Sequence, residues 1–254
     1  MTSSKIQKSG QNMGKTVSKT DIGRKRELNE DYVFTADLSV GKLPNLYLVA
    51  DGMGGHKAGG FASKYAVETI VEVVNSSKEE EVFTILYQAV AEANSKIRKK
   101  AAEDENMAGM GTTLVAATVM DGVLRVANIG DSRLYLVNSG IQQITIDHSY
   151  VEEMIRMGGL DREQARNHKN KNIITRAIGA QKSINPDFFE VNLKKGDRIF
   201  MCTDGVSNML TDEEILYILN EDGTEEERIE KIVATANEHG GRDNMGIIYV
   251  DPQV

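Results

Sequence analysis

The stretch TTLVAATVMDGVLRVANIGDSRLYLVN, residues 112–138, decides the fold. Its first two apolar runs, TTLVAATVM and VLRVANI, lie on either side of Asp121-Gly122. An Asp-Gly pair between two strand-like runs is a strong signal for a β-hairpin with a type I′ turn. Next, RLYLVN is joined to IQQITI by Ser139-Gly140, which predicts a second hairpin of the same kind. We therefore expect an antiparallel meander over residues 112–146.

Apolar runs outside this meander predict further strands and helices. Strands are expected near 17–22, 32–36 and 46–50, and again in FFEVNL, RIFMCT and MGIIYV. Apolar residues at helical spacing predict two helices over 67–97 and two more, at about 213–219 and 229–236. Many antiparallel strands with four one-sided helices indicate an α+β protein in which two sheets pack together and helices cover their outer faces. A short, charged insertion at 147–183 interrupts the pattern.

Composition limits the classes of protein that fit this chain. It has 254 residues, of which 40% are hydrophobic and 27% charged, as in a soluble globular protein with a sizeable core. A net charge of −8 argues against a nucleic-acid binder. Residues 1–16 read as a polar, disordered leader without the apolar core of a signal peptide, and 17–254 as the folded domain. No stretch approaches the roughly 18 apolar residues of a membrane span, so we expect a cytoplasmic protein.

Four aspartates lie where apolar runs end or begin. Asp51 follows LYLVA, Asp131 separates VLRVANIG from RLYLVN, Asp204 follows RIFMCT, and Asp243 precedes NMGIIYV. Taken alone, an acidic turn of this kind is more often a simple turn than part of a functional site. Together, carboxylates at strand ends can converge at one edge of a sheet structure. Oxygen ligands gathered without Cys or His are typical of a Mg²⁺ or Mn²⁺ site rather than a zinc site.

Eight motifs occur in a recognisable order: TDIGRKRELNED, ADGMGGH, GMGTTL, IGDSR, DHS, ITRAIG, TDG and RDN. With them, residues 17–251 resemble the metal-dependent protein phosphatase family (protein phosphatase type 2C). The resemblance is to its bacterial serine/threonine phosphatases, which oppose membrane-bound Ser/Thr kinases. It implies an α-β-β-α sandwich, two central antiparallel sheets flanked by helix pairs, with a binuclear Mn²⁺ or Mg²⁺ site between the sheets. It also implies a mobile flap, here the insertion at 147–183.

The resemblance assigns the metal ligands by matching positions. Asp51 matches the carboxylate that bridges both metals, and the Gly52 carbonyl would add a ligand. Asp204 and Asp243 match the other ligands of one metal, and Glu30 matches a ligand of the second.

Three further positions match residues with other roles in the family. Asp31 would hold a metal-bound water. Asp131 matches the residue that, with Asp204, binds a third and weaker metal in bacterial relatives. Arg26 matches the arginine that holds the substrate phosphate, and a guanidinium can offer two parallel hydrogen bonds to phosphoryl oxygens.

The implied activity is hydrolysis of phosphoserine and phosphothreonine on proteins by a metal-activated water. Phosphate monoesters hydrolyse very slowly in water, so the reaction needs large charge stabilisation. Two cations can supply it and make hydroxide available at neutral pH. The proton donor stays unassigned: relatives that place a histidine two residues after the bridging aspartate differ from this chain, which has Met53 there. A metal-bound water and His56 are the candidates, and His56 could instead only stabilise its loop.

Cys202 offers a different chemistry, that of a cysteine phosphatase. Such an enzyme needs a phosphate-binding arginine six residues after the cysteine, and that position is Asn208. We therefore predict a buried core thiol at Cys202.

Two other functions stay open at this point. One is a catalytically silent pseudophosphatase that binds phosphoproteins, against which the complete ligand set argues. The other is a partner-switching phosphatase that acts on anti-sigma antagonists, whereas the flap-like insertion with ITRAIG favours the kinase-opposing branch. The expected partners are phosphorylated proteins, namely a Ser/Thr kinase and its substrates, with no nucleic acid, and the expected state is a monomer.

Overall fold

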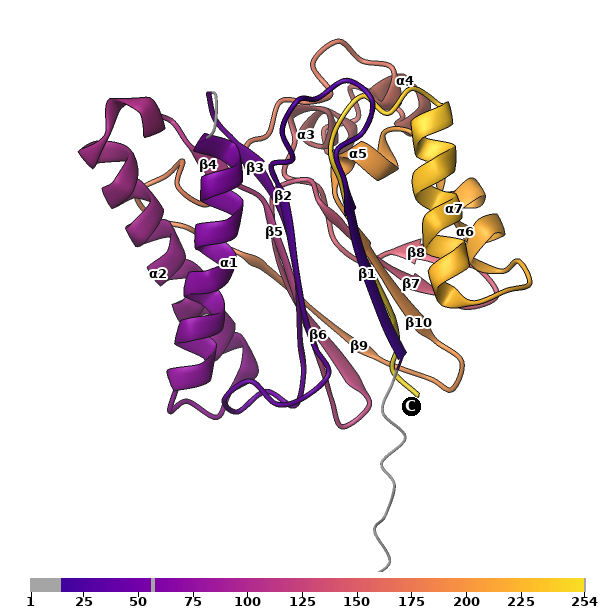
Figure 1. The fold of residues 1–254 in the computed structure, drawn as a ribbon, viewed down its shortest axis with the longest axis horizontal. Coiled ribbons are helices and arrows are strands. Elements are labelled where there is room, and N and C mark those ends of the chain that lie inside the picture. The colour runs from indigo at the N-terminus through magenta and orange to yellow at the C-terminus, as the bar shows by residue number, and fades with distance from the viewer. Residues whose placement is uncertain (1–14, 56–57, 254) are drawn as a thin grey trace, which may run out of the picture.

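Two antiparallel sheets form the centre of the molecule (Figure 1). The structure is a computed structural model that describes residues 15–55 and 58–253. The five-stranded sheet has the order β1 (Lys15–Asp21), β11 (Met245–Asp251), β10 (Arg198–Cys202), β7 (Arg133–Val137) and β8 (Ile141–Gln143). The other sheet has the order β2 (Asp31–Ala36), β3 (Leu46–Met53), β5 (Leu114–Met120), β6 (Val123–Ile129) and β9 (Asp187–Asn192), and the short β4 (Gly111–Thr112) pairs with β3.

Helices cover the outer face of each sheet. The two long helices α1 (Ala58–Ser76) and α2 (Val82–Glu103) lie on the sheet that contains β3, and the 3₁₀ helix η1 (Glu105–Met107) follows α2. On the other sheet lie α6 (Asp212–Leu219) and α7 (Glu225–Glu238), with the short α5 (Asp204–Ser207) directly after β10. Figure 1 shows these two helical layers on opposite sides of the sheets. The predicted α-β-β-α sandwich is therefore confirmed.

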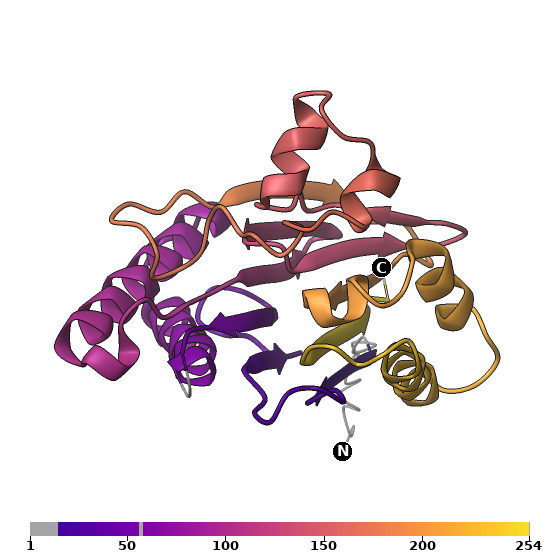
Figure 2. The same cartoon turned by 90° about the horizontal axis from the view of Figure 1, so that it is seen from above.

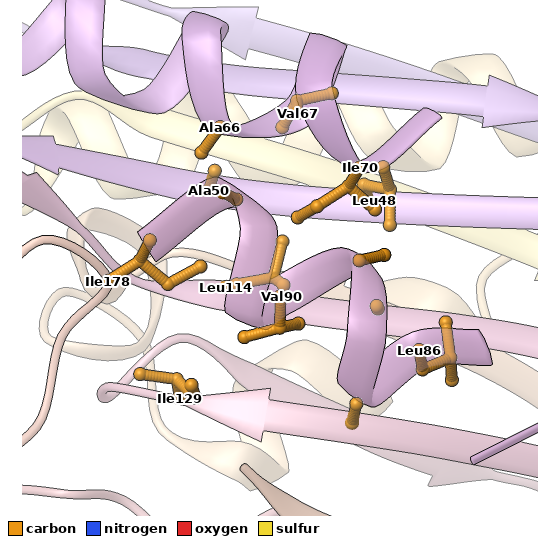
Figure 3. Packing of buried hydrophobic residues seen from close by; sticks show 14 of the residues in the cluster. Leu48, Ala50, Ala66, Val67, Ile70, Leu86, Val90, Leu114, Ile129 and Ile178 are labelled. Carbon is orange, nitrogen blue, oxygen red and sulfur yellow. The ribbon is translucent and has the colours of Figure 1, made fainter. Parts of the chain in front are cut away.

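Strand alternation explains why this architecture has three apolar layers. Along β3, Leu48 and Ala50 face the α1–α2 layer, whereas Tyr47 and Val49 belong to the cluster between the sheets. Figure 3 shows the first of these layers, where Val67 and Ile70 of α1 pack above Leu48. The opposing sheet adds Ile199 of β10 and Ile248 of β11 to the middle layer, and β5 and β6 add further side chains from the sheet that contains β3.

Polar caps fix where the helices begin. Glu81 caps α2, because its carboxylate accepts hydrogen bonds from the backbone N–H groups of Phe83 and Thr84. Thr211 begins α6 and Thr224 begins α7, each in a capping box with the glutamate three residues on. The predicted helices at 213–219 and 229–236 thus form, with starts set by these caps.

The two predicted hairpins form, but only one has the predicted turn. Asp121 and Gly122 have φ values of 54° and 73°, as a type I′ turn requires. Between β7 and β8, however, Val137 pairs with Ile141, so residues 138–140 form a three-residue loop. The N–H of Gly140 donates to Asn138 Oδ1 at 3.1 Å, and Ser139 and Gly140 both lack a positive φ. The type I′ assignment was therefore wrong for this turn.

The boundary of the predicted leader also shifts. β1 begins at Lys15, which pairs with Asp251, so the last two residues of the proposed 1–16 leader belong to the sheet. Residues 1–14 lie outside the described residues. Within the described part of the chain, no helix is long and apolar enough to cross a membrane.

The insertion at 147–183 contains two short helices, α3 (Tyr150–Arg156) and α4 (Arg162–Arg166). Figure 2 shows this salmon-coloured segment standing out from the layers of the sandwich. Two isolated bridges, Ser149 with Ile174 and Thr112 with Ile178, join it to itself and to β4. The insertion thus projects from the sandwich at one end of the sheets, where the predicted metal ligands also lie.

Candidate metal centre

The strand ends bring carboxylates from both sheets into one cluster. Asp31 begins β2 and lies directly opposite Asp51 on β3. Asp204 follows β10, and Asp243 precedes β11, which is the neighbour of β10 in the other sheet. Asp51 is close enough to these aspartates for their charges to act on its carboxyl group. We call the full set the acid cluster: Glu30, Asp31, Asp51, Asp131, Asp204 and Asp243.

Burial and mutual repulsion disfavour the charged forms of these groups. Burial raises the pKa of Asp31, Asp51 and Asp131 well above the usual value, and the charge of Asp204 raises each of them further. Burial also raises the pKa of Asp204 to about 6, with a further contribution from Asp243. Without a cation, the fold therefore holds several acids in an environment that opposes their ionisation.

Four oxygen atoms of the cluster lack any partner. Glu30 Oε1, Asp31 Oδ1, Asp131 Oδ1 and Asp204 Oδ1 are buried and accept no hydrogen bond in the described residues. Buried polar atoms in proteins nearly always have a partner, so four orphaned carboxylate oxygens in one place need a counter-charge. Hard divalent cations such as Mn²⁺ and Mg²⁺ bind such oxygens. The residues present therefore fit the predicted cations.

A hydrogen-bond network fixes the backbone beneath the cluster. Thr203 Oγ1 donates to Asp31 Oδ2 at 2.7 Å and accepts from the N–H of Gly246 at 2.8 Å. Asn244 Oδ1 accepts from the N–H of Glu30 at 2.8 Å, and its Nδ2 donates to two carbonyls of the 22–28 loop at 2.9 Å. These two residues tie the loop before β2 to β10 and β11, across the sandwich.

Close backbone approaches explain the glycines near Asp51. A Cβ on Gly52 would lie 2.0 Å from the carbonyl oxygen of Gly59 and 2.8 Å from that of Glu30. A Cβ on Gly59 would lie 2.4 Å from Glu30 Oε1. Only glycine fits at these two positions, because the start of α1 presses against both β3 and Glu30. The Gly52 carbonyl as a ligand stays a prediction.

Arg26 reaches the cluster from the loop before β2. Its Nη2 donates to Asp243 Oδ2 at 2.7 Å, in a pair separated by 217 residues of sequence. In the described residues, no three Asp, Glu, His or Cys side chains form a group that could hold one metal ion as they stand. Arg26 contacts one oxygen of the Asp243 carboxylate, and the other, Oδ1, accepts from the N–H of Asn244 at 2.9 Å. The individual ligand assignments therefore stay predictions.

Two residues that the sequence analysis discussed, Cys202 and His56, do not belong to the acid cluster. Cys202 is fully buried in the core beneath α6 and α7, and burial raises its thiol pKa, so it is the inert core residue that the sequence predicts. His148, which lies outside the predicted set, has a structural role: its Nδ1 accepts from the N–H of Gly130 at 3.1 Å, and its Nε2 lies 3.2 Å from Asp187 Oδ2. The catalytic candidate His56 lies outside the described residues.

Sequence reasoning missed the supporting residues Thr203 and Asn244. Both lie inside motifs that it quoted, TDG and RDN, next to aspartates that it named. The available signal was their position beside a predicted ligand. A polar side chain next to a buried carboxylate is a natural source of the hydrogen bonds that orient it.

Comparison with known proteins agrees with this geometry. The family model for protein phosphatase 2C matches residues 22–244. The serine/threonine phosphatase Stp of Listeria innocua is 38% identical over 238 residues, which cover 92% of this chain and 94% of that protein. The solved Streptococcus agalactiae serine/threonine phosphatase is 31% identical, with a TM-score of 0.87 over 93% of this chain and 98% of that one.

A second solved structure concerns the cofactor. The catalytic domain of the phosphatase PstP, in complex with two manganese ions, is 30% identical and superposes with a TM-score of 0.82. The match covers 94% of this chain and 97% of that one. The match to the family model includes all six residues of the acid cluster, together with Thr203 and Asn244. The chain belongs to the protein phosphatase 2C family.

Proposed function

We propose that this protein hydrolyses phosphoserine and phosphothreonine on other proteins, with divalent cations held by the acid cluster. The observation that supports this most directly is the group of four orphaned, buried carboxylate oxygens. Family membership and the relatives named as serine/threonine phosphatases support the reaction. The two manganese ions in the related PstP structure support the cofactor, Mn²⁺ or Mg²⁺.

The proposed ligands are the strand-end acids. Asp51 would serve both cations, Asp204 and Asp243 one of them, and Glu30 and the Gly52 carbonyl would complete the set. When bound, the cations supply positive charge that lowers the pKa of water and neutralises phosphoryl oxygens. Charge stabilisation of this kind is the main requirement for hydrolysis of a phosphate monoester.

Asp31 and Arg26 act on the reactants. Thr203 holds one oxygen of Asp31, and the other oxygen is left without a partner and can accept a hydrogen bond from the attacking water. Arg26 is half-exposed and can turn from Asp243 to the substrate phosphate, where its guanidinium binds two oxygens at once. The same residue would thus neutralise Asp243 in the free protein and the phosphate in the complex.

Asp131 would act at the edge of the site, where with Asp204 it would hold a third, weaker cation. Its Oδ1 is one of the orphaned oxygens, and both residues line one cavity. We further propose a cytoplasmic monomer that opposes a Ser/Thr kinase and acts on that kinase's substrates. The bacterial phosphatases among its relatives support this biological setting.

Metal dependence tests the proposal. Release of phosphate from a phosphothreonine peptide should stop in excess EDTA and return when Mn²⁺ is added beyond the chelator. Full activity in excess chelator would contradict the proposed use of cations. A catalytically silent phosphoprotein binder would instead retain the peptide and release no phosphate under any metal condition. Peptide binding and phosphate release should therefore be measured on the same sample.

A further inference from the structure

His148 lies at the start of the insertion at 147–183 and is only 4% exposed. Its imidazole contacts three separate segments: the turn between β6 and β7, the returning end of the insertion, and β9. The first of these segments carries Asp131 directly after Gly130. A buried side chain with these contacts can set the position of a proposed cation ligand in the adjoining turn.

Two hydrogen bonds join His148 to Gly130. The N–H of Gly130 donates to Nδ1 of the imidazole at 3.1 Å, and the backbone N–H of His148 donates to the Gly130 carbonyl at 2.9 Å. Gly130 has a φ of 101°, and a Cβ there would lie 2.5 Å from Thr113 Cγ2. Because the turn packs closely against Thr113 and is bonded to His148, Asp131 has little freedom to shift.

The contact with Gly130 fixes the form of the imidazole. A backbone N–H can only donate, so Nδ1 carries no proton and the ring proton lies on Nε2. Nε2 is 3.2 Å from Asp187 Oδ2, which can accept this proton in a hydrogen bond. Arg176 Nη1 lies 3.2 Å from Nε2 and donates to the other oxygen of Asp187 at 2.8 Å. Burial lowers the pKa of His148, which agrees with a neutral ring.

The residue before His148 holds the other end of the same turn. Asp147 accepts from Arg133 Nη2 at 2.7 Å and from its Nε at 3.1 Å. Gly130 and Arg133 flank the part of the turn that contains Asp131. Two consecutive residues of the insertion therefore support the turn at both ends, and the His148 contact is made to the residue next to Asp131.

We propose that His148 is a positioning residue for Asp131, which holds the turn so that this carboxylate can bind the third cation together with Asp204. This inference rests on the proposed function. Asp131 Oδ1 is buried and accepts no hydrogen bond in the described residues, so its position relative to Asp204 decides whether a cation binds there. Without the imidazole, the buried N–H of Gly130 would lose its acceptor and the turn would shift to find another.

Two substitutions separate the roles of the two ring nitrogens. His148→Asn keeps an oxygen near the place of Nδ1, where it can accept from the N–H of Gly130. His148→Gln reaches the place of Nε2 and can donate to Asp187, but it leaves Gly130 without an acceptor. In calorimetric titrations with Mn²⁺, we expect both variants to keep two tight sites. The third, weaker site should lose affinity about tenfold only in His148→Gln, the effect of one hydrogen bond.

A double variant tests whether His148 acts through Asp131. On a phosphothreonine peptide, kcat should fall in His148→Gln and in Asp131→Ala, while KM changes little. If His148 acts by positioning Asp131, the variant with both substitutions should have the kcat of Asp131→Ala alone. Losses that add, or equal weakening of the third site in His148→Asn and His148→Gln, would overturn the proposal, because His148 would then only support the fold.

The metal-free wild type provides a measurement that does not depend on the variants' folding. Heteronuclear NMR of the imidazole nitrogens should show the Nε2–H tautomer of His148, and the amide of Gly130 should exchange slowly with solvent. An Nδ1–H tautomer would overturn the proposal, because Nδ1 could not then accept from Gly130.

Failure of the proposed function can be told apart from failure of this inference. If the wild type releases no phosphate from the peptide in the presence of Mn²⁺, the proposed function fails. The positioning role is then judged by calorimetry alone: a third site that weakens in His148→Gln and not in His148→Asn supports it. A wild type with no third site refutes it.

Discussion

The acid cluster and the insertion at 147–183 lie side by side but are built in different ways. Asp51 lies on β3 between the buried residues Ala50 and Gly52, and Thr203 and Asn244 tie its surroundings to both sheets. In the insertion, α3 has no buried residue and α4 has one, Ala165. The difference indicates that the fold fixes the chemical groups rigidly and leaves the adjoining segment with little packing to hold it.

This contrast suggests a division of labour. Groups that hold cations need fixed positions, and the ends of paired strands provide them. Segments with few buried apolar contacts open at low free energy and are suited to contact varied substrates. Gly158 has a φ of 75° and is followed by Gly159, which makes this pair a candidate hinge between α3 and α4. The following predictions test the division, beginning with the largest effect.

Substitution of the central carboxylate should abolish most of the activity. Asp51→Asn keeps the size of the side chain but removes the charge that would serve both cations. We expect kcat/KM on a phosphothreonine peptide to fall at least about a hundredfold, roughly 3 kcal/mol of transition-state stabilisation. Circular dichroism checks that the variant is folded. Turnover close to that of the wild type would remove Asp51 from the mechanism.

Removal of the guanidinium should act on substrate binding. Arg26→Ala should raise KM about thirtyfold, which corresponds to about 2 kcal/mol for a bidentate, charge-assisted contact. Metal affinity should be retained or increase, because Arg26 no longer competes for Asp243. Steady-state kinetics and calorimetry measure the two effects separately. Loss of Mn²⁺ affinity would instead assign Arg26 to support of the cluster.

Replacement of the insertion should change selectivity more than chemistry. If residues 150–170 are exchanged for those of a relative, the ratio of kcat/KM between two phosphopeptides should change several-fold, because peptide side chains contact this segment. Turnover of a small aryl phosphate, which reaches only the cluster, should change less. Equal changes for both kinds of substrate would mean that the insertion also shapes the catalytic groups.

The metal-free protein should lose stability as pH rises. A carboxyl group whose pKa is higher in the folded chain takes up protons on folding, so its contribution is complete below the unfolded pKa and is lost as pH rises through the folded one. For Asp204 this window runs from its usual value near 4 to about 6. In EDTA, the melting temperature should therefore fall by about 9 °C across it, the shift that about 3 kcal/mol gives in a domain of this size. Asp204→Asn should reduce the slope.

Local patterns predicted much of the fold because they depend on neighbouring residues. Asp121-Gly122 specified its turn, and the helical stripes specified which faces are buried. The turn at 138–140 escaped prediction because the side chain of Asn138 competes for the backbone N–H of Gly140. The Ser139-Gly140 pair alone does not indicate this hydrogen bond, because the residue before the pair makes it.

The site was predicted less completely, because its contacts join distant parts of the chain. Asp51 and Asp204 were recognisable from motifs at strand ends, whereas the pairing of Arg26 with Asp243 depends on how both sheets meet. The same is true of Thr203, which reaches Asp31 across 172 residues.

Calorimetric titration of the chelator-treated protein with Mn²⁺ tests the central claim, that the acid cluster is a cation site. We expect two tightly bound ions in the wild type, and no tight binding in Asp51→Asn, because the residue proposed to serve both ions has lost its charge. The melting temperature should rise with Mn²⁺ only in the wild type. Binding that is the same in both proteins, or no binding to the wild type, would show that the acid cluster is not the cation site.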